Sequence, residues 1–237
     1  MKIIQALVVG VLSTTSVVYA EAPDPDRILQ GARLSAALTN LDQGLQGNLS
    51  HDGKRTPITI FLKGKDIQFQ FLEDKVLRVF HLRLSENKYE LSEFIDGKQK
   101  TFPPAKLTQP IAGTDLTYED LALRFFYWPS PKLEGEENIG TEQTYKLRLD
   151  KPAGDAGNYF AVYVWVHQKF GAFMRIAGHA KSGEKLKEFQ VEDVMKVSDE
   201  VWTLRKMQVS TFKNGRRSSI TDMTLDKPSK AGLRGLR

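Results

Sequence analysis

The chain has 237 residues, of which 41% are hydrophobic and 27% charged, so it can form a hydrophobic core and is neither disordered nor embedded in a membrane. Its net charge of +5 comes from basic residues scattered along the sequence, without the basic and aromatic stripe typical of nucleic-acid binding. The absence of cysteine excludes disulfides, thiolate metal sites and the acylated N-terminal cysteine of a lipoprotein.

Residues 1–20 have the pattern of a secretory signal peptide. Met1 and Lys2 form a positively charged start, residues 3–12 are an apolar run, and Val18 and Ala20 suit positions −3 and −1 of a cleavage site. An uncleaved anchor is the alternative, but this run is too short to cross about 30 Å of hydrocarbon as a helix. We therefore expect cleavage after Ala20 and export across a bacterial inner membrane to the periplasm.

The first predicted element of the mature chain is a helix, followed by strands. Asp26 can cap the helix, and apolar residues recur at a spacing near 3.6 residues through Leu38. From Leu45 the apolar pattern has a period of two, and turns such as Asp52-Gly53 recur about every ten residues. Connections this short leave no room for crossover helices, so the sheet should be antiparallel. The predicted strands of this run are 45–51, 57–62, 67–72, 76–84 and 89–95.

The segment from Pro103 to Gly140 interrupts the β pattern. Thr117 is a good N-cap, with Asp120 three residues later, and a short helix should end before Pro129. This helix carries the densest aromatic cluster of the chain. Two interpretations are open: the helix is a plug in the core under the sheet, or it is a lid over an apolar cavity.

A second β run follows, with predicted strands at 144–149, 159–166, 173–179, 185–194, 201–211 and 217–225. Both faces of 159–166 are apolar, with Trp165 on one face and Val164 on the other, so this strand needs cover on both sides. The sequence therefore predicts a mainly β (α+β) fold. Its antiparallel sheet is covered by an N-terminal helix and a short central helix.

The motifs of the common enzyme and metal classes are missing. His51, His81, His167 and His179 stand far apart, without HxxxH or HExxH spacing, and no GxSxG, Walker or GxGxxG motif is present. The acidic residues of 134–137 could pair as an acid and a base, but an exposed acidic loop is usually only solvated. We predict no enzymatic activity, no cofactor and no metal.

One family resemblance rests on the run Gly-Thr-Asp-Leu-Thr-Tyr-Glu-Asp-Leu at 113–121, followed by Phe-Tyr-Trp-Pro at 126–129. These motifs resemble the LolA-like outer-membrane lipoprotein-sorting proteins of bacterial envelopes. Supporting stretches lie at 163–166, 189–191, 201–204 and 222–225. The resemblance covers the mature chain and implies an incomplete, strongly curved β-barrel with helices over its open face. It also implies that acyl chains or lipid-bearing partners bind between sheet and helices, without chemistry.

We expect three segments: a signal peptide at 1–20, a single LolA-like domain at 21–226 and a basic, flexible tail at 227–237. The first functional hypothesis is a soluble, monomeric periplasmic carrier or chaperone for lipidated protein or lipid. Its partners would include envelope membrane proteins that donate or accept cargo. We expect no binding of nucleic acid. The expected lining of its apolar cavity is Phe69, Phe71, Phe80, Leu82, Leu121, Phe125, Trp165 and Phe173.

The second hypothesis is a non-catalytic recognition or sensor module on the same fold. An edge strand or the acidic segment 134–142 would then bind an envelope protein or peptide. An interior filled by side chains would favour this second hypothesis over the carrier.

Overall fold

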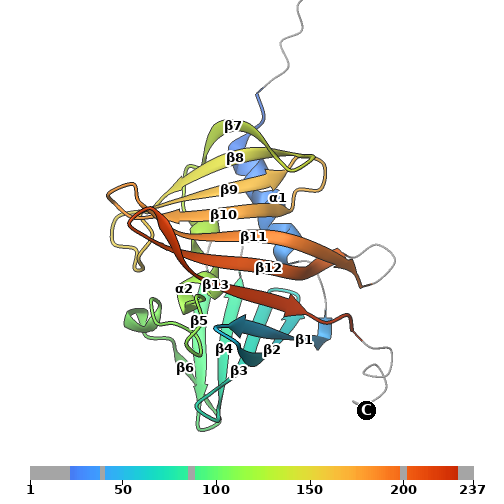
Figure 1. Ribbon diagram of the computed structural model, residues 1–237, viewed down its shortest axis with the longest axis vertical. Coiled ribbons are helices and arrows are strands. Elements are labelled where there is room, and N and C mark those ends of the chain that lie inside the picture. The colour runs from blue at the N-terminus through green and yellow to red at the C-terminus, as the bar shows by residue number, and fades with distance from the viewer. Residues whose placement is uncertain (1–21, 38–40, 85–88, 198–201, 229–237) are drawn as a thin grey trace, which may run out of the picture.

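The computed structural model describes residues 22–37, 41–84, 89–197 and 202–228 (Figure 1). Within these ranges thirteen strands form one sheet in the order β6-β5-β4-β3-β2-β1-β13-β12-β11-β10-β9-β8-β7, with every neighbouring pair antiparallel. The sheet curves without closing into a barrel, which confirms the predicted fold class. The strands are β1 (Leu41–His51), β2 (Lys54–Lys63), β3 (Asp66–Glu73), β4 (Val76–Leu84), β5 (Tyr89–Ile95), β6 (Lys98–Thr101), β7 (Lys132–Ile139), β8 (Glu142–Asp150), β9 (Ala161–His167), β10 (Phe173–His179), β11 (Lys185–Lys196), β12 (Trp202–Lys213) and β13 (Arg216–Leu225).

The predicted signal peptide and all but two residues of the predicted tail lie outside the described residues. No helix in the described ranges is both long and apolar enough to cross a membrane.

The N-terminal helix α1 (Pro25–Ala37) lies behind β8 to β10 in Figure 1. The carboxylate of Asp24 accepts a hydrogen bond from the backbone N–H of Asp26 at 3.0 Å. The helix therefore begins with a cap at Asp24, two residues before the predicted one, because proline suits the first helical position. Leu29 and Ala32 are fully buried, so one face of α1 packs into the core as the apolar spacing predicted.

The hairpin turns hold the conformation that the Asp-Gly and Asn-Gly dipeptides predicted. Asp52 and Gly53 have φ of 44° and 75°, and Asn214 and Gly215 have φ of 52° and 72°. These left-handed values match the right-handed twist of the flanking strands, which is why short antiparallel hairpins use such residues. Most of the sheet is thus a series of local hairpins.

The segment between β6 and β7 fills the concave face of the sheet. It contains η1 (Pro104–Lys106), α2 (Tyr118–Ala122) and η2 (Arg124–Tyr127). The predicted cap is confirmed, because Thr117 and Asp120 form a capping box: the Asp120 carboxylate accepts from the Thr117 N–H at 2.7 Å, and the Thr117 hydroxyl accepts from the Asp120 N–H at 3.4 Å.

Aromatic side chains seal this segment against β3 and β4. The ring of Tyr118 lies 4.8 Å from Phe102, 5.3 Å from Phe80 and 6.1 Å from Phe71 between centroids. Burial raises the pKa of the Tyr118 hydroxyl to about 12. Phe125 is also buried, at 1% exposed. Of the two interpretations of the central helix, the structure matches the plug.

The edge strand β7 corrects one expectation from the sequence. The acidic residues 134–137 were expected in a loop, but they lie in a strand that pairs with β8. The register shifts between Leu133 and Gly135, and Gly135 has a φ of 142°. This irregularity lets the strand continue while Glu134 and Glu136 stay in solvent. Charged side chains on an edge strand also oppose edge-to-edge aggregation.

Candidate functional site

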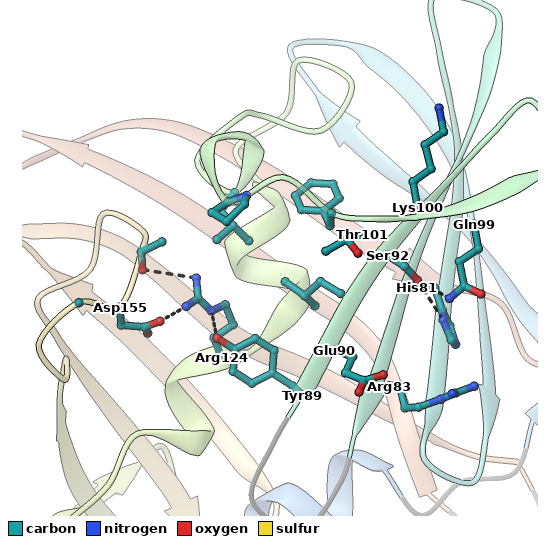
Figure 2. Close-up of a pocket in the computed structure, with 16 residues that line it drawn as sticks. His81, Arg83, Tyr89, Glu90, Ser92, Gln99, Lys100, Thr101, Arg124 and Asp155 are labelled. Carbon is teal, nitrogen blue, oxygen red and sulfur yellow. Dashed lines mark hydrogen bonds and ion pairs between the residues drawn. The ribbon is translucent and has the colours of Figure 1, made fainter.

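A cleft of about 820 Å³ opens between strands β4 to β6 and the loop that joins β8 to β9 (Figure 2). One wall comes from β4, β5 and β6, and the other from the loop between β8 and β9 together with the start of η2. Its volume lies within the range of about 300–1,000 Å³ that is usual for small-molecule sites. The cleft is therefore large enough for a ligand.

The floor of the cleft is apolar. Phe102 and Leu107 are 4% and 2% exposed, and half-buried Leu91 lies beside them on β5. The Phe102 ring stands edge-on to Phe80 at 5.0 Å between centroids. The backbone N–H of Phe102 donates to the Leu91 carbonyl at 3.0 Å, which fixes the floor to the sheet. Of these three residues, Leu91 keeps the most accessible surface for an apolar ligand.

The β4–β6 wall is polar above that floor. The Gln99 amide donates to the Ser92 hydroxyl at 2.8 Å, and the Ser92 oxygen lies 3.4 Å from His81 Nδ1. The carboxylate of Asp66, outside the cleft, contacts His81 Nε2 at 3.1 Å and accepts from Arg83 Nε at 2.8 Å. The hydrogen bond from Arg83 lowers the pKa of Asp66. The polar wall is thus a connected network of side chains.

Arg124 joins the two walls. Its Nε donates to the Tyr89 hydroxyl of β5 at 2.5 Å, and its Nη2 pairs with the Asp155 carboxylate in the β8–β9 loop. Asp155 also accepts a hydrogen bond from Trp128 Nε1 at 2.7 Å. The backbone of Leu123 next to Arg124 is left-handed, with a φ of 47°. The plug segment therefore connects β5 to the β8–β9 loop across the cleft.

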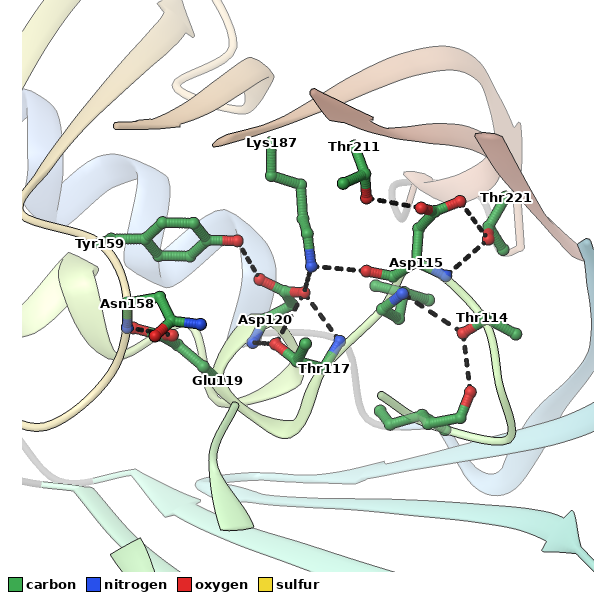
Figure 3. Close-up of polar contacts among 12 residues, drawn as sticks. Thr114, Asp115, Thr117, Glu119, Asp120, Asn158, Tyr159, Lys187, Thr211 and Thr221 are labelled. Carbon is green, nitrogen blue, oxygen red and sulfur yellow. Dashed lines mark hydrogen bonds and ion pairs between the residues drawn. The ribbon is translucent and has the colours of Figure 1, made fainter. Parts of the chain in front are cut away.

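A buried polar network anchors the plug to the second half of the sheet (Figure 3). Asp120 is the centre of this network: its carboxylate accepts from Lys187 Nζ at 2.7 Å and from the Tyr159 hydroxyl at 2.5 Å, besides the two groups of Thr117. Lys187 also donates to the backbone carbonyl of Asp115 at 2.5 Å. Burial raises the pKa of Tyr159 well above its ordinary value, so it stays a donor.

Asp115 anchors the plug to β12 and β13. Its carboxylate accepts hydrogen bonds from Thr211 at 2.5 Å, Thr221 at 2.9 Å and Ser219, and lies 3.2 Å from His51 Nδ1. Burial alone would raise the pKa of Asp115, but the three hydroxyl donors outweigh it and leave the pKa lowered. The charged form of Asp115 is thus the one that this site holds.

Glu119 is the third buried acid of the plug. It is 3% exposed, and burial raises the pKa of its carboxyl although the backbone N–H of Asn158 donates to it at 2.9 Å. Gly157 lies so close to the Glu119 carboxylate that a Cβ there would overlap it. The run 113–121 therefore acts as an anchor through Asp115, Glu119 and Asp120.

These contacts support binding better than chemistry. Each buried acid of the plug is engaged by hydrogen-bond donors, and none of the three lines the cleft. Within the described residues, no three His, Asp or Glu side chains are grouped so that they could hold a metal ion.

The structure places the eight predicted lining residues in two groups, neither of them in the cleft. Trp165 lies in a small separate cluster with Ile139 and Ala177, on the face of β9 opposite Val164. The rest belong to the main core around the plug and are buried to 7% or less, apart from partly buried Phe173. That group comprises Phe69, Phe71, Phe80, Leu82, Leu121, Phe125 and Phe173.

Sequence reasoning missed the residues that form the cleft. Phe102 and Leu107 flank the Pro103-Pro104 step, a pattern typical of a chain that leaves a sheet. Arg124, a lone cation inside the aromatic cluster, was the other available signal, because a buried arginine needs a partner. Its partner Asp155 lies in a loop that no local pattern connects to it.

The open, curved antiparallel sheet with helices against its concave face is a LolA-like fold. A family model described as "Uncharacterized protein" matches residues 97–231, more than half of the chain, and the chain belongs to that family. No curated protein matches the sequence.

Three solved structures share the fold. A DUF1329 family protein from Desulfovibrio piger is 17% identical, with a TM-score of 0.64 over 86% of this chain and 92% of that one. A protein described as an outer membrane lipoprotein-sorting protein domain, from Vibrio parahaemolyticus, is 12% identical, with a TM-score of 0.65 over 85% and 89%. The LolA superfamily protein NE2245 from Nitrosomonas europaea is 17% identical, with a TM-score of 0.61 over 86% and 92%.

Proposed function

We propose that this protein is a soluble, monomeric periplasmic carrier or chaperone that binds lipidated protein or lipid acyl chains. Residues 1–20 direct export, and residues 21–226 form the single carrier domain. Its partners are acylated cargo and envelope membrane proteins that donate or accept it. The role is one of binding, without catalysis, cofactor or nucleic acid.

The observation that carries this proposal is the cleft between β4 to β6 and the β8–β9 loop of the LolA-like fold. We place the acyl chain on the floor of Leu91, Phe102 and Leu107, instead of in the interior that the plug fills. Burying a chain of about 14–18 carbons contributes roughly 10 kcal/mol before costs, at about 0.8 kcal/mol per CH₂. The polar wall then faces the head group or the peptide that bears the acyl chain.

The first experiment is extraction of the natively purified protein with organic solvent, followed by mass spectrometry for lipid or acylated peptide. If the protein is a carrier, the extract should contain lipid in stoichiometric amount. Leu91→Glu places a charge on the cleft floor and should abolish this lipid and the binding of added fatty acid. Leu133→Glu, at a half-buried leucine of β7, is the matched control and should bind like the wild type. A lipid-free extract together with no binding of fatty acid or lipopeptide would refute the carrier.

The second candidate is a recognition module for an envelope protein or peptide. The filled interior favours it, because Phe125 and Tyr118 occupy the space expected for acyl chains. Among the described strands β7 has a partner on one side only, so its free edge could accept an extended peptide. Charge reversal at Glu134 and Glu136 would then weaken partner binding and leave fatty-acid binding unchanged.

A further inference from the structure

Exposed cations are concentrated at the end of the sheet that carries the β1–β2, β10–β11 and β12–β13 turns. These strands are neighbours in the order β2-β1-β13-β12-β11-β10, and antiparallel pairing places their three turns at the same end. The β12–β13 hairpin extends beyond the β1–β2 turn, because β1 ends opposite Thr221. We call this cluster the basic rim. It consists of the half-buried Lys185 and six exposed residues: Lys54, Arg55, Lys181, Lys213, Arg216 and Arg217.

Two contacts join the β10–β11 and β12–β13 turns into one surface. The backbone N–H of Gly215 donates to the Glu184 carboxylate at 3.3 Å. The Lys185 ammonium lies 4.0 Å from the centre of the Phe212 ring and pairs with Glu188 at 2.9 Å. The basic rim is therefore continuous over the β10–β11 and β12–β13 turns, and the ring of Phe212 lies beneath the Lys185 ammonium.

Most of these cations are not neutralised within the protein. Lys54, Arg55, Lys181, Lys213 and Arg216 form no ion pair with any residue in the part of the chain that the structure describes. Within the three turns and the strand residues next to them, the acids are Asp52, Glu184 and Glu188, so the seven cations of the rim and these three carboxylates have a local net charge of +4.

We propose that the basic rim docks on an anionic phospholipid membrane surface. Its cations stand on turns or on strand residues next to them, and none lines the cleft, a layout that suits a broad layer of phosphates. A cluster of four to eight Lys and Arg is the usual footprint of such binding. Since Lys185 covers Phe212, the rim lacks the open aromatic platform on which nucleic-acid bases stack.

Docking by the rim also orients the cleft. The β8–β9 loop, which supplies Asp155 and Ala156 to one wall of the cleft, lies at the same end of the sheet as the β10–β11 and β12–β13 turns, on the left in Figure 1. The rim would therefore bring that wall toward the lipid from which acyl cargo is taken. This orientation rests on the proposed function, whereas membrane docking itself does not.

The test is co-sedimentation of the purified protein with vesicles of phosphatidylethanolamine and phosphatidylglycerol, compared with vesicles of phosphatidylcholine alone. We expect binding to the anionic vesicles only, and its loss at high salt. The triple variant Lys213→Gln, Arg216→Gln, Arg217→Gln should bind about 100-fold more weakly, at about fivefold for each cation removed. All three substitutions are at exposed positions, and a thermal melt verifies folding.

The matched control removes three exposed cations from the opposite end of the sheet: Lys63→Gln, Lys65→Gln and Lys169→Gln. This control changes the net charge equally and should keep vesicle binding within about threefold of the wild type. Equal losses in both triple variants would overturn the proposal, as would equal binding to phosphatidylcholine vesicles. Tighter binding to polyglutamate than to anionic vesicles would also overturn it and indicate an acidic protein partner.

Fatty-acid binding in solution separates this proposal from the carrier function. The rim variant should bind fatty acid like the wild type, because none of its three positions lines the cleft. A protein that sediments with anionic vesicles but binds no fatty acid would refute the carrier and leave the docking surface standing. The reverse result would refute the docking surface alone.

Discussion

Lys187→Met should strongly destabilise the protein, because it removes the cation that faces a fully buried carboxylate. The Lys187 side chain is 9% exposed and the Asp120 side chain 0%. Breaking a buried ion pair on one side costs about 3–5 kcal/mol, mainly through the charge left behind. Asp120 keeps three hydrogen bonds, from the Thr117 N–H, the Thr117 hydroxyl and Tyr159, so we expect the lower end, about 3 kcal/mol.

The assay is denaturant unfolding at pH 7 followed by tryptophan fluorescence, with Lys185→Met as the control on the same strand. Lys185 and Glu188 are 32% and 26% exposed, so that control should cost no more than about 1 kcal/mol. The double variant Asp120→Asn, Lys187→Met should lose less than the sum of the two single losses, by at least about 1 kcal/mol. A Lys187→Met loss no larger than the control, or strictly additive losses, would refute the anchor role of this pair.

Two further predictions concern Glu119, which precedes Asp120 in the sequence. Gly157→Ala should cost about 2 kcal/mol in unfolding free energy, because Gly157 has a φ of 101° and the new Cβ would overlap Glu119; Gly154→Ala, at a φ of 81° with open space around it, should cost less. Since burial raises the folded-state pKa of Glu119 above 4.5, the folded state binds the extra proton, and stability should fall as pH rises from 4.5 through that raised pKa. Glu119→Gln should remove this fall in unfolding free energies measured across the same pH range, and an unchanged pH profile would count against the assignment.

The turn-rich β pattern could be predicted from the sequence because its determinants are local. Dipeptides such as Asn214-Gly215 specify a hairpin by their own backbone preferences, and Thr117 with Asp120 specifies a helix start. The edge strand β7 was missed because consecutive glutamates resemble a loop. It forms nevertheless because β8 supplies hydrogen-bond partners along its length.

The site was harder to predict because it depends on distant segments. A period of two separates Trp165 from Val164, but it does not say which face meets the plug; the structure assigns that face to Val164. The aromatic residues were predicted to line a cavity, but an apolar pattern in the sequence does not distinguish a cavity lining from the packed core in which most of them lie. The two walls of the cleft are joined by Tyr89 and Asp155, 66 positions apart in the sequence, which both contact Arg124.

The pairing of β1 with β13 determines the order in which the fold can be completed. Strands β1 to β6 and β7 to β13 each follow the chain order, so neighbouring strands find each other quickly. The two halves are joined by the pairing of β1 with β13, in which Gly47 lies opposite Leu225. This seam can form only when nearly the entire polypeptide is present. Until β13 arrives, β1 presents an unpaired edge, which is the state most prone to aggregation. A chain shortened before Thr221 would lose this seam and, with it, one of the hydroxyls that hold Asp115.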